Sequence, residues 1–187
     1  MTVLIGISGS LRRGSFNSAV LRAAAELLPS DVQLNIETIA NIPLYDGDAE
    51  AEHGIPAAVS RLKDAISDAD GLLLVTPEYN NSMPGVAKNA VDWLSRPAAD
   101  IPRVFGRRPV GIAGASPGGF GTILSQNAWL PVFKTLGAQL WSGSRLLVSR
   151  ASHVVDADGR IADAATRDAI RKFMEGFVRF VRETKAP

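Results

Sequence analysis

The chain has no cysteine among its 187 residues, and this absence excludes several kinds of chemistry at once. Without thiols there can be no disulfide, no thiolate nucleophile, no cysteine-ligated zinc and no iron–sulfur cluster. No metal site is expected. Redox chemistry, if the protein performs any, has to reside in a bound cofactor.

Long apolar runs and a strong net charge are also missing. The net charge is +1, and basic residues are scattered among acidic ones, so no electrostatic field favours nucleic acid or an anionic membrane. No stretch is long enough to span a bilayer. The first apolar run, residues 3–7, is followed rather than preceded by its nearest charges, Arg12 and Arg13, the reverse of a signal peptide. The sequence predicts a cytoplasmic protein without nucleic-acid or membrane partners.

Apolar segments of two different periodicities alternate along the chain. Short continuous runs are typical of strands buried on both faces, and the expected strands are residues 3–7, 32–39, 71–76, 109–115 and a fifth within 139–148. Apolar residues at helical spacing predict helices at 17–28, 59–66, 86–94, 123–136 and 170–181. Pro131 is expected to bend or split the fourth of these helices. Residues 42–56 are expected to form a loop, and residues 156–159 a turn.

This alternation predicts a parallel sheet with helices on both faces, because parallel neighbours need right-handed crossover connections. We expect one α/β domain over residues 1–187, a three-layer sandwich whose five-stranded parallel sheet has the order 2-1-3-4-5. Ligands of such sheets bind beyond the carboxyl ends of the strands, where the strand order reverses. The loops after the first and third strands are therefore the predicted site.

The segment Gly9–Ser18, which joins the first strand to the first helix, is dense in hydrogen-bond donors. Free N–H groups at a helix start favour an anion, and Arg12 can donate two parallel bonds to a phosphate. Four more side chains can add hydrogen bonds: Ser10, Ser15, Asn17 and Ser18. In the alternative interpretation, Ser15 or Asn17 only caps the helix. Because the donors outnumber what a cap needs, the segment predicts a phosphate site. No Lys-Ser/Thr pair follows a G-x-x-x-x-G, so a triphosphate site would lack its lysine, and the G-x-G-x-x-G fingerprint of dinucleotide sites is absent.

Two further loops follow the third and fourth strands and reach the same edge of the sheet. In residues 77–85, Asn80 and backbone N–H groups can meet the pyrimidine edge of a flavin, with Tyr79 along the ring. The alternative is a helix start with Ser82 as its cap. Residues 116–121 contain Ser116 and several glycines, Gly118 among them, which allow a ring to approach the backbone closely. The three loops together predict FMN.

With these residues placed, the chain resembles the NADPH-dependent FMN reductase family of flavodoxin-like proteins, especially its chromate and quinone reductase members. The resemblance rests on Gly9–Asn17, Ile42–Asp46, Pro77–Asn80 and Lys88–Arg96. It implies FMN as the cofactor, NADPH or NADH as the electron donor, and a homodimer or homotetramer. It also implies which residues hold the phosphate: Ser10, Arg12, Ser15, Phe16, Asn17 and Ser18. The ring would be bordered by Pro77, Glu78, Tyr79, Asn80 and Ser116.

No acid, base or nucleophile stands out in the predicted pocket, so we expect no catalytic side chain and assign the chemistry to flavin N5. The hypothesis is a ping-pong transfer in which NAD(P)H delivers a hydride and leaves, after which a quinone, flavin, dye or metal oxyanion takes the electrons. One alternative is a flavodoxin-type electron carrier without NAD(P)H turnover, although such carriers are usually strongly acidic. A non-redox phosphate-binding module is another alternative, since fold does not fix function.

The remaining conspicuous side chains are given structural interpretations. Arg12, Arg13 and the arginines of 103–108 either attract the 2′-phosphate of NADPH or serve solubility. The tryptophans are expected in the core or at a subunit contact rather than on the flavin: Trp93, Trp129 and Trp141. His53 and His153 are expected to have no role.

Overall fold

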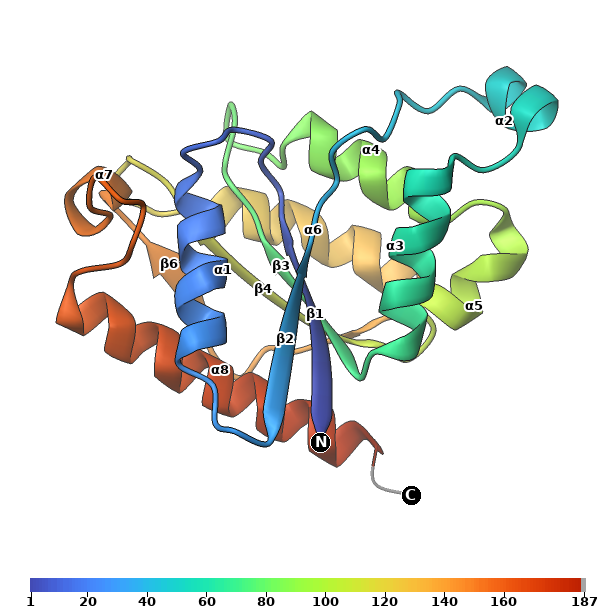
Figure 1. The fold of residues 1–187 in the computed structure, drawn as a ribbon. Helices are drawn as coiled ribbons and strands as arrows, with labels where there is room; N and C mark the ends of the chain where they lie inside the picture. Colours follow the sequence, from blue (N-terminus) through green and yellow to red (C-terminus); the bar gives the residue numbers. More distant parts are fainter. Residues whose placement is uncertain (186–187) are drawn as a thin grey trace.

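A parallel sheet forms the centre of the protein in the computed structural model, which describes residues 1–185 (Figure 1). Its strand order is β2-β1-β3-β4-β5, and β6 also pairs with β4. The strands are β1 (Thr2–Ser8), β2 (Val32–Glu37), β3 (Gly71–Val75), β4 (Pro109–Ala115), β5 (Gln139–Leu140) and β6 (Leu146–Val148). All pairings within the sheet are parallel. The predicted α/β class and strand order are confirmed.

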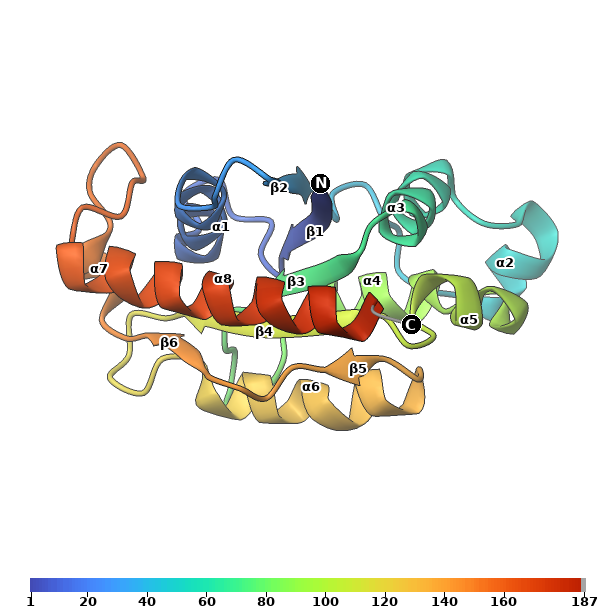
Figure 2. The ribbon, with the colours of Figure 1, turned by 90° about the horizontal axis from the view of Figure 1, so that it is seen from below.

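Alternate residues of the central strands point into two separate hydrophobic cores. Leu4, Leu73 and Ala113 face the core formed with α1 (Phe16–Glu26) and α8 (Ala164–Lys185). Ile5, Leu72 and Ile112 face the core on the other side. The helices α3 (Ala57–Asp68), α4 (Gly85–Leu94), α5 (Ile101–Val104) and α6 (Ile123–Thr135) cover that side. Figure 2 shows α1 and α3 on opposite sides of β1 and β2. This two-sided burial explains why the strands are apolar throughout.

Four local features differ from the sequence expectation. Residues 42–56 are not all loop, because α2 (Gly47–His53) forms within them behind the N-cap of Asp46, whose side chain accepts from the Asp48 N–H (2.9 Å). The fifth strand is split into β5 and β6. Helix α6 runs through Pro131 without a break, and Trp129 and Phe133, both fully buried, fix the helix on either side of it. The short helices η1 (Ala98–Asp100), α5 and α7 (Ala151–Val154) were not expected.

The loop connections at the carboxyl edge of the sheet pack closely against one another. A Cβ on Gly114 in β4 would lie 1.9 Å from Thr122 Oγ1 and 2.3 Å from the carbonyl oxygen of Thr76. Real Cβ atoms do not approach other atoms so closely, so glycine is required there. The ends of β3 and β4 and the start of α6 are thereby brought into direct contact.

A buried cation joins the helices on the far side of the sheet from α1. Lys63 of α3 is only 2% exposed, forms an ion pair with Asp100 and donates to the carbonyl oxygen of Arg96. The hydrogen bond from Lys63, with another from Arg103, lowers the pKa of the Asp100 carboxyl. Loss of Asp100 would leave the buried Lys63 ammonium without this counter-charge, which is costly.

The tryptophans have the structural places that we expected. Trp93 and Trp129 are buried, and Trp141 packs edge-on against Phe173 of α8 with ring centroids 4.7 Å apart. His53 lies exposed at the end of α2. Within residues 1–185, no helix combines the length and apolar character needed to cross a membrane.

Candidate functional site

Three loops at the carboxyl edge of the sheet enclose a cavity of about 210 Å³. They follow β1, β3 and β4, and in Figure 1 the first two stand side by side at the top of the molecule. The lining residues are Ser10, Arg12, Ser15, Phe16, Asn17, Pro77, Glu78, Tyr79, Ala115, Ser116 and Pro117. Most of the residues expected at the site are therefore brought together. Ser18, Asn80 and Gly118 are outside the lining, whereas Ala115 and Pro117 are in it although the sequence did not single them out.

The start of α1 offers hydrogen-bond donors to this cavity. Ser15 is the N-cap of the helix, and its hydroxyl oxygen accepts from the Ser18 N–H (3.3 Å), so its own proton stays available for donation. The N–H groups of Phe16 and Asn17, in the first turn, have no acceptor within the helix. The hydroxyl oxygen of Ser10 accepts from the Arg12 N–H (3.2 Å) in the same way. Both hydroxyls, the open N–H groups and the positive end of the helix dipole favour an anion here.

Arg12 supplies the positive charge of the cavity. Its Nη2 donates to the carbonyl oxygen of Gly14 (2.7 Å), and its guanidinium lies over the Phe16 ring, with Cζ 4.8 Å from the centroid. These two contacts fix the plane of the guanidinium and leave its other N–H groups for an incoming ligand. The neighbouring Arg13 is exposed and does not line the cavity.

Asn17 has a different role from the one expected of its side chain. It is 3% exposed, its Nδ2 donates to the Ala115 carbonyl oxygen (3.0 Å), and its Oδ1 accepts from the Ala115 N–H (2.8 Å). The side chain therefore ties the start of α1 to the end of β4, 98 residues later. Only the backbone N–H of Asn17 is left for an anion. Ser18 likewise contributes its N–H to the Ser15 cap and not to the cavity.

The loop after β3 ends in a tight turn that holds Tyr79 at the cavity. Tyr79 and Ser82 exchange two backbone hydrogen bonds (3.1 and 3.0 Å) across Asn80 and Asn81. Both asparagines adopt left-handed conformations, with φ of 50° and 61°, as in the two-residue turns of β-hairpins. Asparagine tolerates this region better than other non-glycine residues. The alternative assignment of Ser82 as a helix cap is wrong, since Pro84 is the N-cap residue of α4.

The third loop is fixed to its surroundings by backbone contacts. The Ser116 hydroxyl donates to the Gly121 carbonyl oxygen (2.6 Å), and the Gly118 carbonyl oxygen accepts from the N–H of Arg150 (2.9 Å). Phe120 is 85% exposed in the same loop. The loop therefore lines the cavity with a fixed backbone at Ser116 and Pro117, and it carries one exposed aromatic ring.

Two segments that carried the sequence resemblance, Ile42–Asp46 and Lys88–Arg96, bind each other. Asn89 accepts from the Tyr45 N–H (2.8 Å) and donates to the Pro43 carbonyl oxygen (2.8 Å), which also accepts from Trp93 Nε1 (2.9 Å). The ring of Tyr45 packs edge-on to that of Trp93 with centroids 5.0 Å apart. Helix α4 thus grips the segment after β2, a contact that sequence reasoning missed.

The contact between these two segments extends to α2, because both segments hydrogen-bond to the carboxylate of Glu50. Glu50 accepts from Arg96 Nε and from the Tyr45 hydroxyl, both at 2.9 Å. The hydrogen bond from Arg96 lowers the pKa of Glu50, and the bond to Glu50 raises the pKa of Tyr45. At neutral pH the cluster therefore holds a carboxylate, a neutral phenol and a guanidinium.

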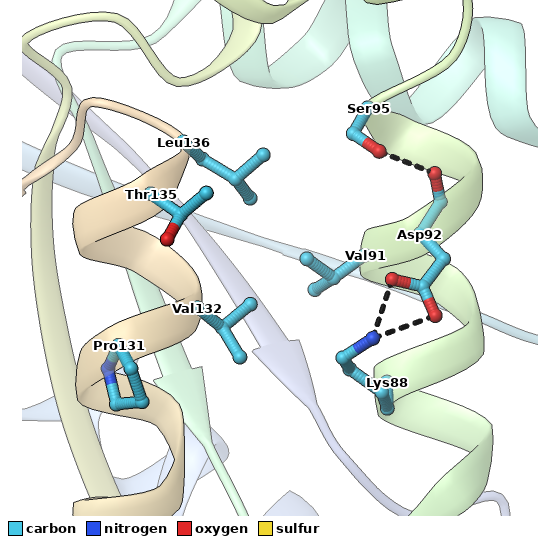
Figure 3. A pocket seen from close by; sticks show the side chains of 8 residues that line it. All are labelled: Lys88, Val91, Asp92, Ser95, Pro131, Val132, Thr135 and Leu136. Carbon is cyan, nitrogen blue, oxygen red and sulfur yellow. Dashed lines mark hydrogen bonds and ion pairs between the residues drawn. The ribbon is translucent and has the colours of Figure 1, made fainter.

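A second hollow, of about 360 Å³, lies between α4 and α6 (Figure 3). Val91 of α4 faces Val132 and Leu136 of α6 across it, and the charged pair of Lys88 and Asp92 (2.6 and 2.8 Å) stands on one side. Lys88 is already paired within its own helix. The hollow lacks the convergent donors of the loop cavity, so the loop cavity is the better candidate for a phosphate-bearing ligand.

Comparison with known proteins agrees with this geometry. The family model for NADPH-dependent FMN reductase matches residues 1–153, which include all three loops of the cavity. The chain belongs to this family. The expected resemblance is confirmed, and so is the expected enzyme class of oxidoreductases with FMN and NAD(P)H as cofactors.

Individual members of the family match over almost their whole lengths. An NAD(P)H-dependent FMN reductase of Pseudomonas aeruginosa is 40% identical over 182 residues, 97% of this chain and 96% of the relative. A 2-hydroxy-1,4-benzoquinone reductase of Burkholderia sp. is 39% identical over 179 residues, 96% of each chain. The solved structure of FerB, a flavoenzyme NAD(P)H:(acceptor) oxidoreductase from Paracoccus denitrificans, superposes with a TM-score of 0.86 at 30% identity and covers 98% of both chains.

Proposed function

We propose that this protein is an FMN-dependent NAD(P)H oxidoreductase that passes electrons to quinones. The observation that carries the proposal is the donor set around the start of α1, where Ser10, Arg12, Ser15 and two open N–H groups converge on one cavity. This set fits a phosphate monoester in charge and in hydrogen-bonding capacity. The whole of residues 1–187 would act as one flavodoxin-like FMN-binding domain.

The other end of the cavity fits a planar ring. Tyr79 and Ser116 border it, and the two backbone bonds between Tyr79 and Ser82 hold Tyr79 in place. When bound, FMN supplies hydride and electron transfer at its ring, and the protein supplies orientation and exclusion of water. The cavity is smaller than the roughly 300–1,000 Å³ of typical ligand sites. A cofactor of this size would therefore extend beyond it and keep one side open to reactants.

Exposed apolar side chains favour quinones as acceptors. Each of the three loops carries one: Leu11 (54% exposed), Tyr79 (49%) and Phe120 (85%). Such side chains suit a flat apolar molecule laid against the open side of the ring. One open side would be used in turn by NAD(P)H and by the acceptor, which corresponds to ping-pong kinetics. Dyes, free flavins and metal oxyanions such as chromate would use the same side.

For cell location and assembly, we keep the expectation from the sequence. We propose a cytoplasmic homodimer or homotetramer whose partners are small molecules. Helix α6 supports an assembly, because Lys134 is its only charged residue while Leu124 and Leu130 are exposed on its outer side. Exposed apolar side chains on a helix with so little charge are typical of a surface covered by a partner.

Spectroscopy and kinetics of the purified protein test the proposal. We expect a yellow protein, or one that takes up FMN, whose flavin is bleached anaerobically by NADPH or NADH and recoloured by a benzoquinone. Double-reciprocal plots of initial rate against NAD(P)H concentration, recorded at several quinone concentrations, should be parallel, as a ping-pong mechanism requires. A flavin that binds but is not bleached by either nucleotide would indicate an electron carrier instead. A protein that takes up no FMN would refute the proposal.

A further inference from the structure

The loop after β3 is anchored to helix α6 by a buried hydrogen-bond network. Thr76 Oγ1 donates to the Pro77 carbonyl oxygen (2.9 Å), accepts from Trp129 Nε1 (3.1 Å) and contacts Ser125 Oγ (3.0 Å). Thr76, Ser125 and Trp129 are all fully buried. The first residues of the loop therefore take their position from α6, and not only from the strand that precedes them.

Glu78 extends this network to the start of α6. Its Oε2 accepts from the N–H groups of Leu124 (2.9 Å) and Ser125 (3.0 Å). Thr122, the N-cap residue of α6, makes no capping bond with its own side chain in the described part of the chain. Glu78 thus caps a helix that begins 45 residues later, and the positive end of that helix stabilises its carboxylate.

The contact between Glu78 and α6 links two of the loops that surround the cavity. Glu78 precedes Tyr79 and the left-handed turn, and Thr122 ends the loop that contains Ser116. One carboxylate therefore joins two of the three loops that surround the cavity. Both loops line the cavity, the first through Pro77, Glu78 and Tyr79 and the second through Ser116 and Pro117.

We infer that Glu78 is a positioning residue: its carboxylate fixes the Tyr79–Ser82 turn against the loop before α6, and so sets the width of the ring end of the cavity. The inference rests on the proposed function for its link to flavin. Glu78 would neither donate a proton nor bind the ring through its carboxylate, because that carboxylate is occupied by α6. Arg12 and Glu78 would then act on opposite ends of the same cofactor.

Binding of two flavins separates this role from a phosphate role. In Glu78→Ala we expect the affinities for FMN and for riboflavin, which lacks the phosphate, to fall by the same factor, about tenfold or more, as the loss of a helix cap and two charge-assisted bonds implies. The rate of anaerobic bleaching by NADPH at saturating flavin should also fall. Glu78→Gln, which keeps one acceptor oxygen, should recover part of both losses and covers the case in which the alanine variant fails to fold.

Asp163→Ala provides the matched control. Asp163 caps α8 through Thr166 N and Thr166 Oγ1, both at 2.7 Å, and does not line the cavity. This variant should lose a helix cap without any change in flavin affinity. If the Glu78 variants lose thermal stability as Asp163→Ala does but bind both flavins like the wild type, the positioning role is refuted.

Hydrogen exchange of the flavin-free protein gives a readout that does not depend on the proposed function. The Tyr79 and Ser82 amides should exchange faster in Glu78→Gln than in the wild type and in Asp163→Ala. Unchanged exchange of these amides would overturn the inference. If the wild type binds no flavin but the two amides still exchange faster in Glu78→Gln, the proposed function is refuted and the positioning role of Glu78 is retained.

Discussion

Replacing Arg12 by alanine should weaken the binding of FMN and leave the binding of riboflavin unchanged. Among the residues that the structure describes, Arg12 is the only basic one that lines the loop cavity, and one of its N–H groups is already bonded to Gly14. The remaining groups can make charge-assisted bonds to a phosphate, each contributing about 1.5–3 kcal/mol. Loss of one such contribution corresponds to about a 10- to 150-fold increase in the dissociation constant of FMN.

Titration of the flavin-free protein, followed by quenching of flavin fluorescence, measures this change. Riboflavin serves as the internal reference, because it has the ring and no phosphate. Arg12→Lys should give an intermediate loss, since lysine keeps the charge but not the planar fork or its stacking on Phe16.

Arg13→Ala is the control for the Arg12 variants. It removes the same charge from the adjacent position, where the side chain is exposed and does not line the cavity. At about 0.15 M salt an exposed charge of this kind is largely screened, so FMN affinity should hardly change. Equal losses for FMN and riboflavin in Arg12→Ala, or an equal effect of Arg13→Ala, would contradict the phosphate assignment.

Three further variants test the framework of the site. Asn17→Ala should lower the free energy of unfolding in urea by about 2–4 kcal/mol, because two backbone groups at the end of β4 lose their buried partners. Gly114→Ala should cost about 3 kcal/mol or more in the same assay, or prevent folding, whereas Gly85→Ala, with open space around it, should be neutral or slightly stabilising. Asp100→Ala should lower Tm at neutral pH by leaving Lys63 unpaired. Because the pKa of Asp100 is lower in the folded state, the stability from this pair is present above the unfolded pKa and lost as pH falls through the folded pKa, so Tm of variant and wild type should converge in acid.

Hydrophobic periodicity was sufficient to predict the sheet order and the main helices, since each strand buried on both faces reads as an unbroken apolar run. It failed at α2, whose seven residues include three acids and bury no side chain, so that they show no apolar stripe. It also failed at the fifth strand. Residues 141–145 between β5 and β6 leave the sheet there, although the apolar character resumes at Leu146.

Composition was a good guide to which loops form the site and a poor guide to what each side chain does. Ser10, Arg12 and Ser15 lie where local donor density predicted them. Asn17 and Glu78 belong to the same segments, but their partners lie 98 and 46 or 47 residues away in the chain. The spacing of residues within a loop contains no signal for such distant partners. Only the fold therefore distinguishes a side chain that holds another segment in place from one that binds the cofactor.

The attachment of the segment after β2 to α4 limits how the two can be exchanged between proteins. Asn89, Trp93 and Arg96 recognise the backbone of Pro43 and Tyr45 and the carboxylate of Glu50. A chimera that imports residues 42–53 from a relative would seat them correctly only on an α4 and following residues that bear these three side chains. In protein engineering, the two segments should therefore be exchanged together, although some 35 residues separate them in the chain.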